Sequence, residues 1–332
     1  MFKSSGNGAV DDETSLATRA AWLYYVGGHR QEDIALRLGV SRIKVNRLIA
    51  LAHREGLVRV FVEGTPAECV RLEDELGRLF GLSMCSVAPD VGDPLEEGLP
   101  LHTLGVAAAR WLQRRLEDPE LAVVGVGHGR TLAAVVERLP RIARPDLRFV
   151  SLLGSLNRKA AANPFDVIQR LAERTGAEGY FLPVPFFADT IEDKAVLGAQ
   201  RAVRTALDLA TRVDLVVMGI GEVTPNARMV RDGMMTETEF TELRRLGAVG
   251  EALGTYVDLA GRPVDADLNR RLLAVPIDIL RGREVIAVSG GAGKVEAIVG
   301  VLRTGLVTGL VTDEPTAAQI VTLAQRPKRS GR

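Results

Sequence analysis

The chain has 332 residues, of which 46% are hydrophobic and 25% charged, a composition typical of a folded globular protein with more than one domain. Its 42 lysines and arginines balance 42 aspartates and glutamates, so a polyanionic partner has to be inferred from a local excess of basic residues. The two cysteines, Cys69 and Cys85, lie apart and without a neighbouring pair of histidines, which excludes a disulfide scaffold and a zinc site. With no apolar leader and no run of about 18 apolar residues, we expect a cytoplasmic protein with no membrane segment, metal or cofactor.

The chain opens with a polar leader and a predicted helix. Residues 1–11 are small and polar and are expected to be a loose leader outside the fold. From Asp12 the pattern becomes helical, and Gly27 and Gly28 end the run. The residues expected to face inward from this helix are Leu16, Ala20, Leu23 and Tyr24.

Two shorter helices follow. Residues 31–38 have helical spacing and precede Gly39, a residue suited to the left-handed conformation that ends a helix. Ser41 is a good N-cap for a third helix, which Gly56 ends. The segment "LVRVFVEG", residues 57–64, predicts a strand or a small wing. The inward residues expected of the two helices are Ile34, Ala35, Leu38, Val45, Leu48, Ile49 and Ala52.

Three helices and a wing over 12–64 are typical of a winged helix-turn-helix. In that motif the recognition helix places the side chains of its first turns in the major groove of DNA. Between Ser15 and Gly64 there are eight lysines and arginines against four aspartates and glutamates, and no acid lies between Ser41 and Arg54. The alternative is that these basic residues form an ordinary solvated helix face. DNA binding is favoured because the basic charge, the glycine in the turn, the N-cap and the apolar spacing all fit a helix-turn-helix. The residues expected to face operator DNA are Gln31, Ser41, Arg42, Lys44, Asn46 and Arg47.

From residue 65 the chain alternates short apolar strands with helical segments. Strands joined by crossover helices favour a mostly parallel sheet that is covered on both faces. We therefore expect an α/β fold with a large, doubly wound domain over 65–325, followed by a basic tail at 326–332. The expected strands are Ser83–Ala88, Leu121–Val126, Phe149–Leu153, Gly179–Val184, Leu215–Ile220, Val285–Ser289 and Gly309–Thr312. The expected helices among them are Leu101–Leu116, Thr131–Leu139, Pro164–Thr175 and Lys194–Ala210.

Two turns rich in glycine each follow a strand and begin a helix. They are "GVGHGRTL", after the second expected strand, and "SGGAGK", which ends in Lys294. Backbone N–H groups at a helix start attract phosphate or hydroxyl oxygens, and open α/β sheets bind ligands beyond the carboxyl ends of their strands. The dinucleotide fingerprint is absent, because its last glycine, counted from Gly127, is Leu132. A tight strand-to-helix turn and a solvent-exposed lysine are the alternatives.

Acidic residues lie in two further segments. "GAVGEALGTYVDLAGRPV" contains Glu251 and Asp258, which are suited to accepting hydrogen bonds from sugar hydroxyls, although solvated loop acids would give the same pattern. Asp313 comes directly after the last strand, where the N-cap of a final helix is the alternative to a ligand contact.

Five motifs, in this order, resemble the SorC family of bacterial transcriptional regulators over nearly the whole chain. They are "YYVGGHRQEDIALRLGVSRIKVNRLIALAHREGLVRV", "GVGHGRTL", "GAVGEALG", "SGGAGKVEAI" and "LVTDEPTA". The resemblance implies a helix-turn-helix followed by a sugar-binding domain similar to ribose-5-phosphate isomerase and glucosamine-6-phosphate deaminase, assembled as a tetramer. The effector residues that it implies are Gly127, Gly129, Thr131, Glu251 and Lys294.

The chain departs from the family pattern at two places. His128 stands where many members have an aromatic or small residue, and "LLGSLNRKAAANPFDVI" has no basic residue directly beside its glycine. The departures leave open whether the ligand carries a phosphate, for which Arg130, Arg158 and Lys159 would compensate, or is an unphosphorylated sugar or polyol. His128 and Arg130 are expected at the effector together with Asn163, and Asp166 is expected to reach the same place.

These observations predict a regulator of a carbohydrate or polyol catabolic operon, controlled by a sugar, polyol or sugar phosphate. We expect a homo-oligomer, dimer or tetramer, that binds operator DNA and has no catalytic residues. The alternative is an isomerase- or deaminase-like enzyme with a fused DNA-binding domain, in which Glu251 would act as the base. No pairing of an acid with a lysine stands out from binding residues in the sequence.

Overall fold

The computed structural model describes residues 7–58, 66–92, 94–155, 167–225, 228–231 and 233–326. The chain divides into two compact units, Met1–Gly64 and Thr65–Arg332. Most of the expected wing, the segment with Arg158, Lys159, Asn163 and Asp166, and the tail beyond residue 326 lie outside the described residues. Within the described ranges, no helix combines the length and the apolar character needed to cross a membrane.

The first unit is built from helices. They are α1 (Asn7–Ala21), a π-helical turn (Trp22–Val26), α2 (Gln31–Leu38) and α3 (Arg42–Arg54). Helix α1 begins at Asn7, so the last part of the expected leader is helical. Gly39 adopts a φ of 64° at the end of α2, and the Ser41 side chain accepts a hydrogen bond of 3.2 Å from the Lys44 N–H at the start of α3.

The core of this unit is small and aliphatic. Its buried members are Ala17, Ala20, Ala21, Ile34, Val45, Leu48, Ile49 and Ala52. The expectation that Tyr24 faces inward is wrong, since this residue is 37% exposed. Tyr24 lies in the π-helical turn, whose wider i→i+5 bonding rotates side chains away from the face that the 3.6-residue spacing predicts.

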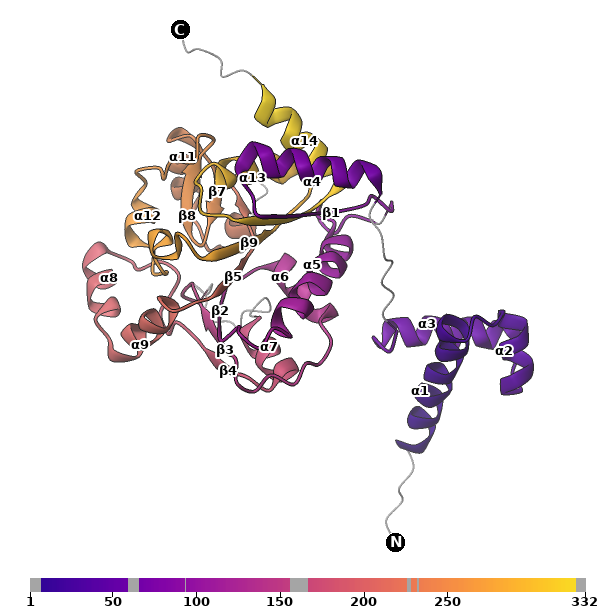
Figure 1. Ribbon diagram of the computed structural model, residues 1–332. Helices are drawn as coiled ribbons and strands as arrows, with labels where there is room; N and C mark the ends of the chain where they lie inside the picture. The colour runs from indigo at the N-terminus through magenta and orange to yellow at the C-terminus, as the bar shows by residue number, and fades with distance from the viewer. Residues whose placement is uncertain are drawn as a thin grey trace. The chain divides into compact units, whose positions relative to one another are not determined.

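The second unit contains a parallel sheet of seven strands in the order β1-β10-β9-β5-β2-β3-β4 (Figure 1). Each of the seven expected strands has a counterpart, although β4 shares only its last two residues with the expected Gly179–Val184, and every neighbouring pair is parallel. The carboxyl ends of all seven strands therefore meet at one edge of the sheet. The strands are β1 (Met84–Ala88), β2 (Val123–Val126), β3 (Arg148–Ser151), β4 (Glu178–Tyr180), β5 (Leu215–Met218), β9 (Glu284–Val288) and β10 (Gly309–Asp313).

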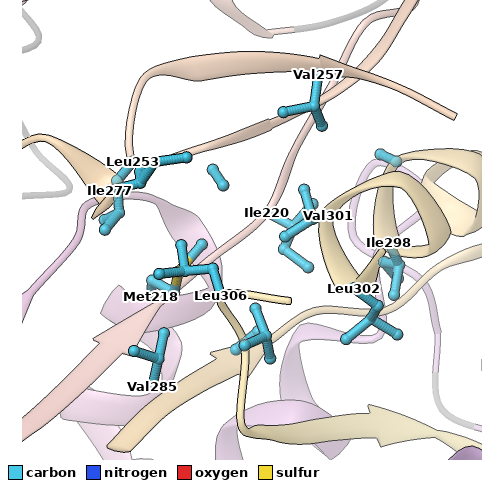
Figure 2. Packing of buried hydrophobic residues seen from close by; sticks show 14 of the residues in the cluster. Met218, Ile220, Leu253, Val257, Ile277, Val285, Ile298, Val301, Leu302 and Leu306 are labelled. Carbon is cyan, nitrogen blue, oxygen red and sulfur yellow. The ribbon is translucent and has the colours of Figure 1, made fainter. Parts of the chain in front are cut away.

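Helices cover both faces of this sheet (Figure 1). One face packs against α4 (Ala67–Phe80), α9 (Arg201–Ala210), α13 (Val295–Leu302) and α14 (Glu314–Gln325). The other packs against α5 (Leu101–Leu116), α6 (Arg130–Arg138) and α7 (Ile168–Thr175). Figure 2 shows the first of these cores, where Ile298, Val301 and Leu302 of α13 lie among Ile220 and Leu306.

The remaining helices are short. The single helix expected over Lys194–Ala210 is two, α8 (Ile191–Gly198) and α9, because Gln200 between them has an extended backbone. Helix α8 has no buried residue, and its Leu197 packs only partly buried against the cluster that contains Val203 and Ala206 of α9. The others are α10 (Arg228–Arg231), α11 (Glu237–Arg245), α12 (Asp267–Arg271) and two 3-10 turns, Ile277–Leu280 and Ala292–Lys294.

A second, antiparallel sheet was not expected from the sequence. It has the order β6-β7-β8, with β6 (Gly221–Glu222), β7 (Ala248–Ala252) and β8 (Thr255–Asp258). Strands β7 and β8 are joined by the two-residue turn Leu253–Gly254, in which φ is 48° and 83°. Because β6 begins three residues after β5 ends, the small sheet extends from the carboxyl edge of the large one.

Candidate functional site

The first glycine loop, residues 127–129, joins β2 to α6 at the carboxyl edge. Gly129 has a φ of 119°, which favours glycine, at the start of α6. The Gly127 N–H donates to the Val217 carbonyl of β5 at 2.9 Å, and a Cβ at Gly127 would lie 3.4 Å from Leu253. The loop therefore lies next to the end of β5 and to the β7–β8 turn.

His128 links this loop to β3. Its Nε2 lies 3.0 Å from the Ser151 hydroxyl, which itself donates to the Leu153 carbonyl at 2.8 Å. Because the hydroxyl has one proton, the His128 Nε2 is the donor of the first bond. Thr131, in the first turn of α6, is only 7% exposed. These contacts orient the loop and the start of α6. They give the polar residue His128 of "GVGHGRTL" a structural role.

The second glycine loop follows β9 and lies against the start of α14. Gly291 has a φ of 101°, and its N–H donates to the Thr316 hydroxyl at 2.8 Å. The Asp313 carboxylate accepts hydrogen bonds from the Thr316 N–H at 3.1 Å and hydroxyl at 2.9 Å. Asp313 is therefore the N-cap of α14, as the alternative interpretation of "VTDEP" predicted.

Lys294 is buried at the end of the second loop. It is 9% exposed, so the alternative of a solvent-exposed lysine is wrong. Its ammonium donates to the Ile220 carbonyl at 2.5 Å and lies 3.2 Å from the Glu222 carboxylate. A buried ammonium needs such partners, because the loss of its hydration is otherwise uncompensated.

Glu251 lies on β7, opposite Gly221 of β6. Its carboxyl group accepts a hydrogen bond from the Gly254 N–H in the β7–β8 turn. Burial raises the pKa of Glu251, and the Gly254 N–H and the charge of Lys294 oppose that shift without cancelling it. The group therefore keeps its proton to higher pH than an exposed glutamate, and a protonated carboxyl can both donate and accept hydrogen bonds to a hydroxyl.

The structure thus gathers several of the predicted effector residues at one edge. The loop containing Gly127 and the residues Glu251 and Lys294 all lie beyond the carboxyl ends of β2, β5 and β9 or on the sheet that continues from them. Arg130 is directed instead to Glu97, its partner at 2.6 Å. Asn163 is outside the described residues.

Sequence reasoning missed two acids at this edge. Glu222 follows the apolar run of β5 by four residues, and a search for polar residues after every strand would have found it. Glu97 lies in the irregular segment between β1 and α5, where no periodic pattern marks it. Asp258 is engaged locally, since its carboxylate accepts hydrogen bonds from Ala260 and Arg262 in the same loop.

Helix α3 carries most of the polar side chains that are predicted to face DNA, and they are exposed. Arg42, the first residue of this helix, forms an ion pair of 3.1 Å with Glu32, in which both side chains are about two-thirds exposed, 67% and 65%. Such a pair contributes little stability and opens readily. The other predicted DNA-facing residues of α3, which are also exposed, are Lys44, Asn46 and Arg47, with Ser41 exposed at the cap and Gln31 half-buried at the start of α2.

The chain is similar in sequence to one described protein family and to known transcriptional regulators. Residues 65–322 match a protein family described as "Putative sugar-binding domain". The erythritol catabolism regulatory protein EryD of Brucella abortus is 46% identical over 312 residues, covering 94% of this chain and 98% of that protein. The transcriptional regulator LsrR of Klebsiella pneumoniae is 32% identical over 317 residues and covers 94% of each chain.

Solved structures have the same fold. The full-length sorbitol operon regulator SorC from Klebsiella pneumoniae aligns with a TM-score of 0.68 and 24% identity, over 93% of this chain and 99% of that one. A domain of a sugar-binding transcriptional regulator from Arthrobacter aurescens aligns with a TM-score of 0.69 and 27% identity over 78% of this chain.

A parallel α/β domain with polar loops at its carboxyl edge, preceded by a helix-turn-helix, defines a transcriptional regulator that responds to a small ligand. The matches to the sugar-binding domain and to regulators along the whole chain are specific enough to name the family. The chain belongs to the SorC-like family of sugar-binding transcriptional regulators.

Proposed function

We propose that the chain represses or activates a polyol or sugar catabolic operon by binding its operator through α3, and that a ligand at the carboxyl edge of the sheet controls this binding. The observation that carries the effector part is the buried Lys294, which is paired with Glu222 and is close enough to Glu251 for its charge to oppose the rise in the pKa of Glu251. A ligand rich in hydroxyl groups is recognised by buried polar groups that still have hydrogen-bonding capacity and that a rigid sheet holds in place.

The proposed effector is a small polyol or sugar. Gly129 and Thr131 would present backbone and hydroxyl donors to it, and Gly127 would line the same loop, with its own N–H bonded to Val217. Glu251 and Lys294 would bind the hydroxyl groups of the ligand. His128 would orient the first loop through Ser151. The relative with 46% identity is named for erythritol catabolism, so erythritol is the first compound to test.

The proposed DNA contacts come from α3. Arg42, Lys44 and Asn46 would reach base edges from the first turns of the helix, while Ser41, Gln31 and Arg47 would bind phosphates. Because helix-turn-helix domains read two-fold operators as dimers, the second unit would hold two or four copies together in the cytoplasm, where the operon lies.

The test combines selection of DNA with a ligand panel. Sequences bound from a random pool define the operator, and fluorescence anisotropy then measures its affinity with and without four- to six-carbon polyols, sugars and their phosphates. At least one compound should shift the operator affinity and also raise the melting temperature, because a ligand that binds the native state stabilises it. A chain that selects no sequence would contradict the proposal.

The enzyme alternative is tested with the same compounds. Relatives over the full length are named as regulators, which favours a binding role for Glu251 over that of a catalytic base. Incubation with pentose and hexose phosphates, followed by NMR, should leave the substrates unchanged. Turnover that disappears in Glu251→Gln would instead support the isomerase-like function.

A further inference from the structure

Glu97 holds two arginines at the carboxyl edge of the sheet. Its Oε2 accepts hydrogen bonds from the Arg130 guanidinium at 2.6 Å and from the Arg231 guanidinium at 2.8 Å. Arg130 is the first residue of α6, directly after the first glycine loop, and its side chain is only 14% exposed. Arg231 ends α10 and is 47% exposed. Charge-assisted bonds of this length are among the strongest polar contacts in proteins.

The backbone around Glu97 is built to keep the carboxylate there. Glu96 and Leu99 exchange two backbone hydrogen bonds, of 2.9 and 3.1 Å, which close a tight turn. Within that turn Glu97 has a φ of 51°, a conformation that costs a residue with a side chain about 1 kcal/mol or more. Gly98 has its carbonyl against the second glycine loop, where a Cβ at Gly291 would lie 2.6 Å from it.

Two guanidinium groups that converge beside a helix start, as those of Arg130 and Arg231 do at the start of α6, are suited to binding a phosphate. Here the carboxylate of Glu97 already lies between them. Lys294, the buried cation of the same edge, has its own counterion in Glu222. An anionic ligand group would have to displace a carboxylate that is held by two ion pairs, whereas an uncharged hydroxyl group would not.

We propose that Glu97 is a specificity-determining residue: it occupies the anion position between Arg130 and Arg231, and so makes the site select an uncharged polyol or sugar over its phosphorylated form. This inference rests on the proposed function, because it concerns the ligand of the same edge. The internal carboxylate supplies the negative charge that a phosphate would otherwise bring, and it repels a second anion at the same place.

The test uses the variant Glu97→Gln, which keeps the size of the side chain and removes its charge. Inorganic phosphate is titrated by calorimetry into wild type and variant, and erythritol and erythritol 4-phosphate are titrated in parallel. The variant should bind inorganic phosphate and the phosphorylated polyol at least about tenfold more tightly than wild type, which corresponds to about 1.4 kcal/mol. Its affinity for erythritol should change by less than about threefold, a smaller difference than one charge-assisted bond gives.

Two further variants control for indirect effects. Glu96→Gln makes the same chemical change one residue earlier, at an exposed side chain of the same turn, and should behave as wild type. Glu97→Asn also removes the charge, and asparagine tolerates the left-handed backbone of this position, so it should keep the turn folded and gain phosphate binding like Glu97→Gln.

The phosphate titration decides the inference separately from the proposed function. Unchanged phosphate affinity in both folded Glu97 variants, or wild type that already prefers erythritol 4-phosphate to erythritol, overturns the role of Glu97. If phosphate binding appears in the variants but no sugar or polyol affects DNA binding, the anion position is confirmed and the proposed effector control is wrong.

Discussion

The ammonium of Lys294 donates a hydrogen bond to the carbonyl of Ile220, which lies 74 residues earlier in the chain. This contact ties the turn after β9 to the turn after β5, and Glu222 completes it with an ion pair of 3.2 Å. The lysine thus has a structural role in addition to the ligand contact that we propose. Substitutions at this position have to separate the two roles.

We expect Lys294→Met to lower the free energy of unfolding by about 3–5 kcal/mol, since it leaves the largely buried Glu222 carboxylate without its counterion. The double variant Lys294→Met, Glu222→Gln should recover much of this loss, because both charges are then removed. Urea unfolding, monitored by circular dichroism, measures the free energy of unfolding of the single and the double variant. The double variant, once folded, should bind operator DNA normally and fail to respond to the effector. An intact effector response in that variant would remove Lys294 from the site.

Glu251→Gln should change the pH dependence of stability. The pKa of Glu251 is raised in the folded chain, chiefly by burial, from an ordinary value of 4.5. Below that value the group is protonated in both states and contributes its full stability. As the pH rises, the unfolded carboxyl ionises first, so the stability contributed by Glu251 falls until the pH passes its folded pKa.

The variant, which is neutral throughout, should therefore become more stable relative to wild type as the pH increases above about 4.5. Thermal unfolding over a series of buffers measures the difference. Glu137→Gln, which makes the same change at an α6 side chain that is 70% exposed, is the control for removing one carboxylate from the surface. A stability difference that does not vary with pH for Glu251→Gln would contradict the raised pKa.

Arg42 and Arg54 form a matched pair for testing how α3 reads DNA. They lie at opposite ends of the helix, and each forms an exposed ion pair, Arg42 with Glu32 at 3.1 Å and Arg54 with Glu55 at 3.5 Å. Arg42→Ala should reduce discrimination at one base pair by about 1–3 kcal/mol if the side chain reads guanine. Arg54→Ala should weaken binding little, and equally on all sequences. Equal losses on operator and random DNA for Arg42→Ala would exclude base reading by this residue.

We expect the chain to be a dimer or tetramer in solution. A small helix-turn-helix binds tightly only when two copies engage two half-sites, so the second unit has to supply the interface. Size-exclusion chromatography with light scattering at micromolar concentration measures the mass directly. The unit Thr65–Arg332, expressed alone, should show the same oligomeric state, whereas a monomer of the full chain, with and without operator DNA, contradicts the prediction.

Local sequence patterns determined the elements of this fold. The seven strands of the parallel sheet, the cap at Ser41 and the left-handed Gly39 could all be predicted, because periodicity, capping and φ preference act over a few neighbouring residues. The β6-β7-β8 sheet was not predicted, because β6 has only two residues and three of the five residues of β7, Ala248, Gly250 and Ala252, are alanine or glycine, which have low strand propensity. The π-helical turn at Tyr24 likewise has no recognisable pattern of apolar residues in the sequence.

The pairing of charges was decided by the tertiary structure alone. The sequence marked Arg130 and Lys294 as cations of the glycine loops, but their partners come from distant segments: Glu97, 33 residues before Arg130, and Ile220, 74 residues before Lys294. The periodicity of apolar residues predicts which face of a helix or strand is buried. It does not predict which loops meet at the end of a sheet. That meeting depends on the strand order, in which β9, β5 and β2 are neighbours although other strands and helices separate them along the chain.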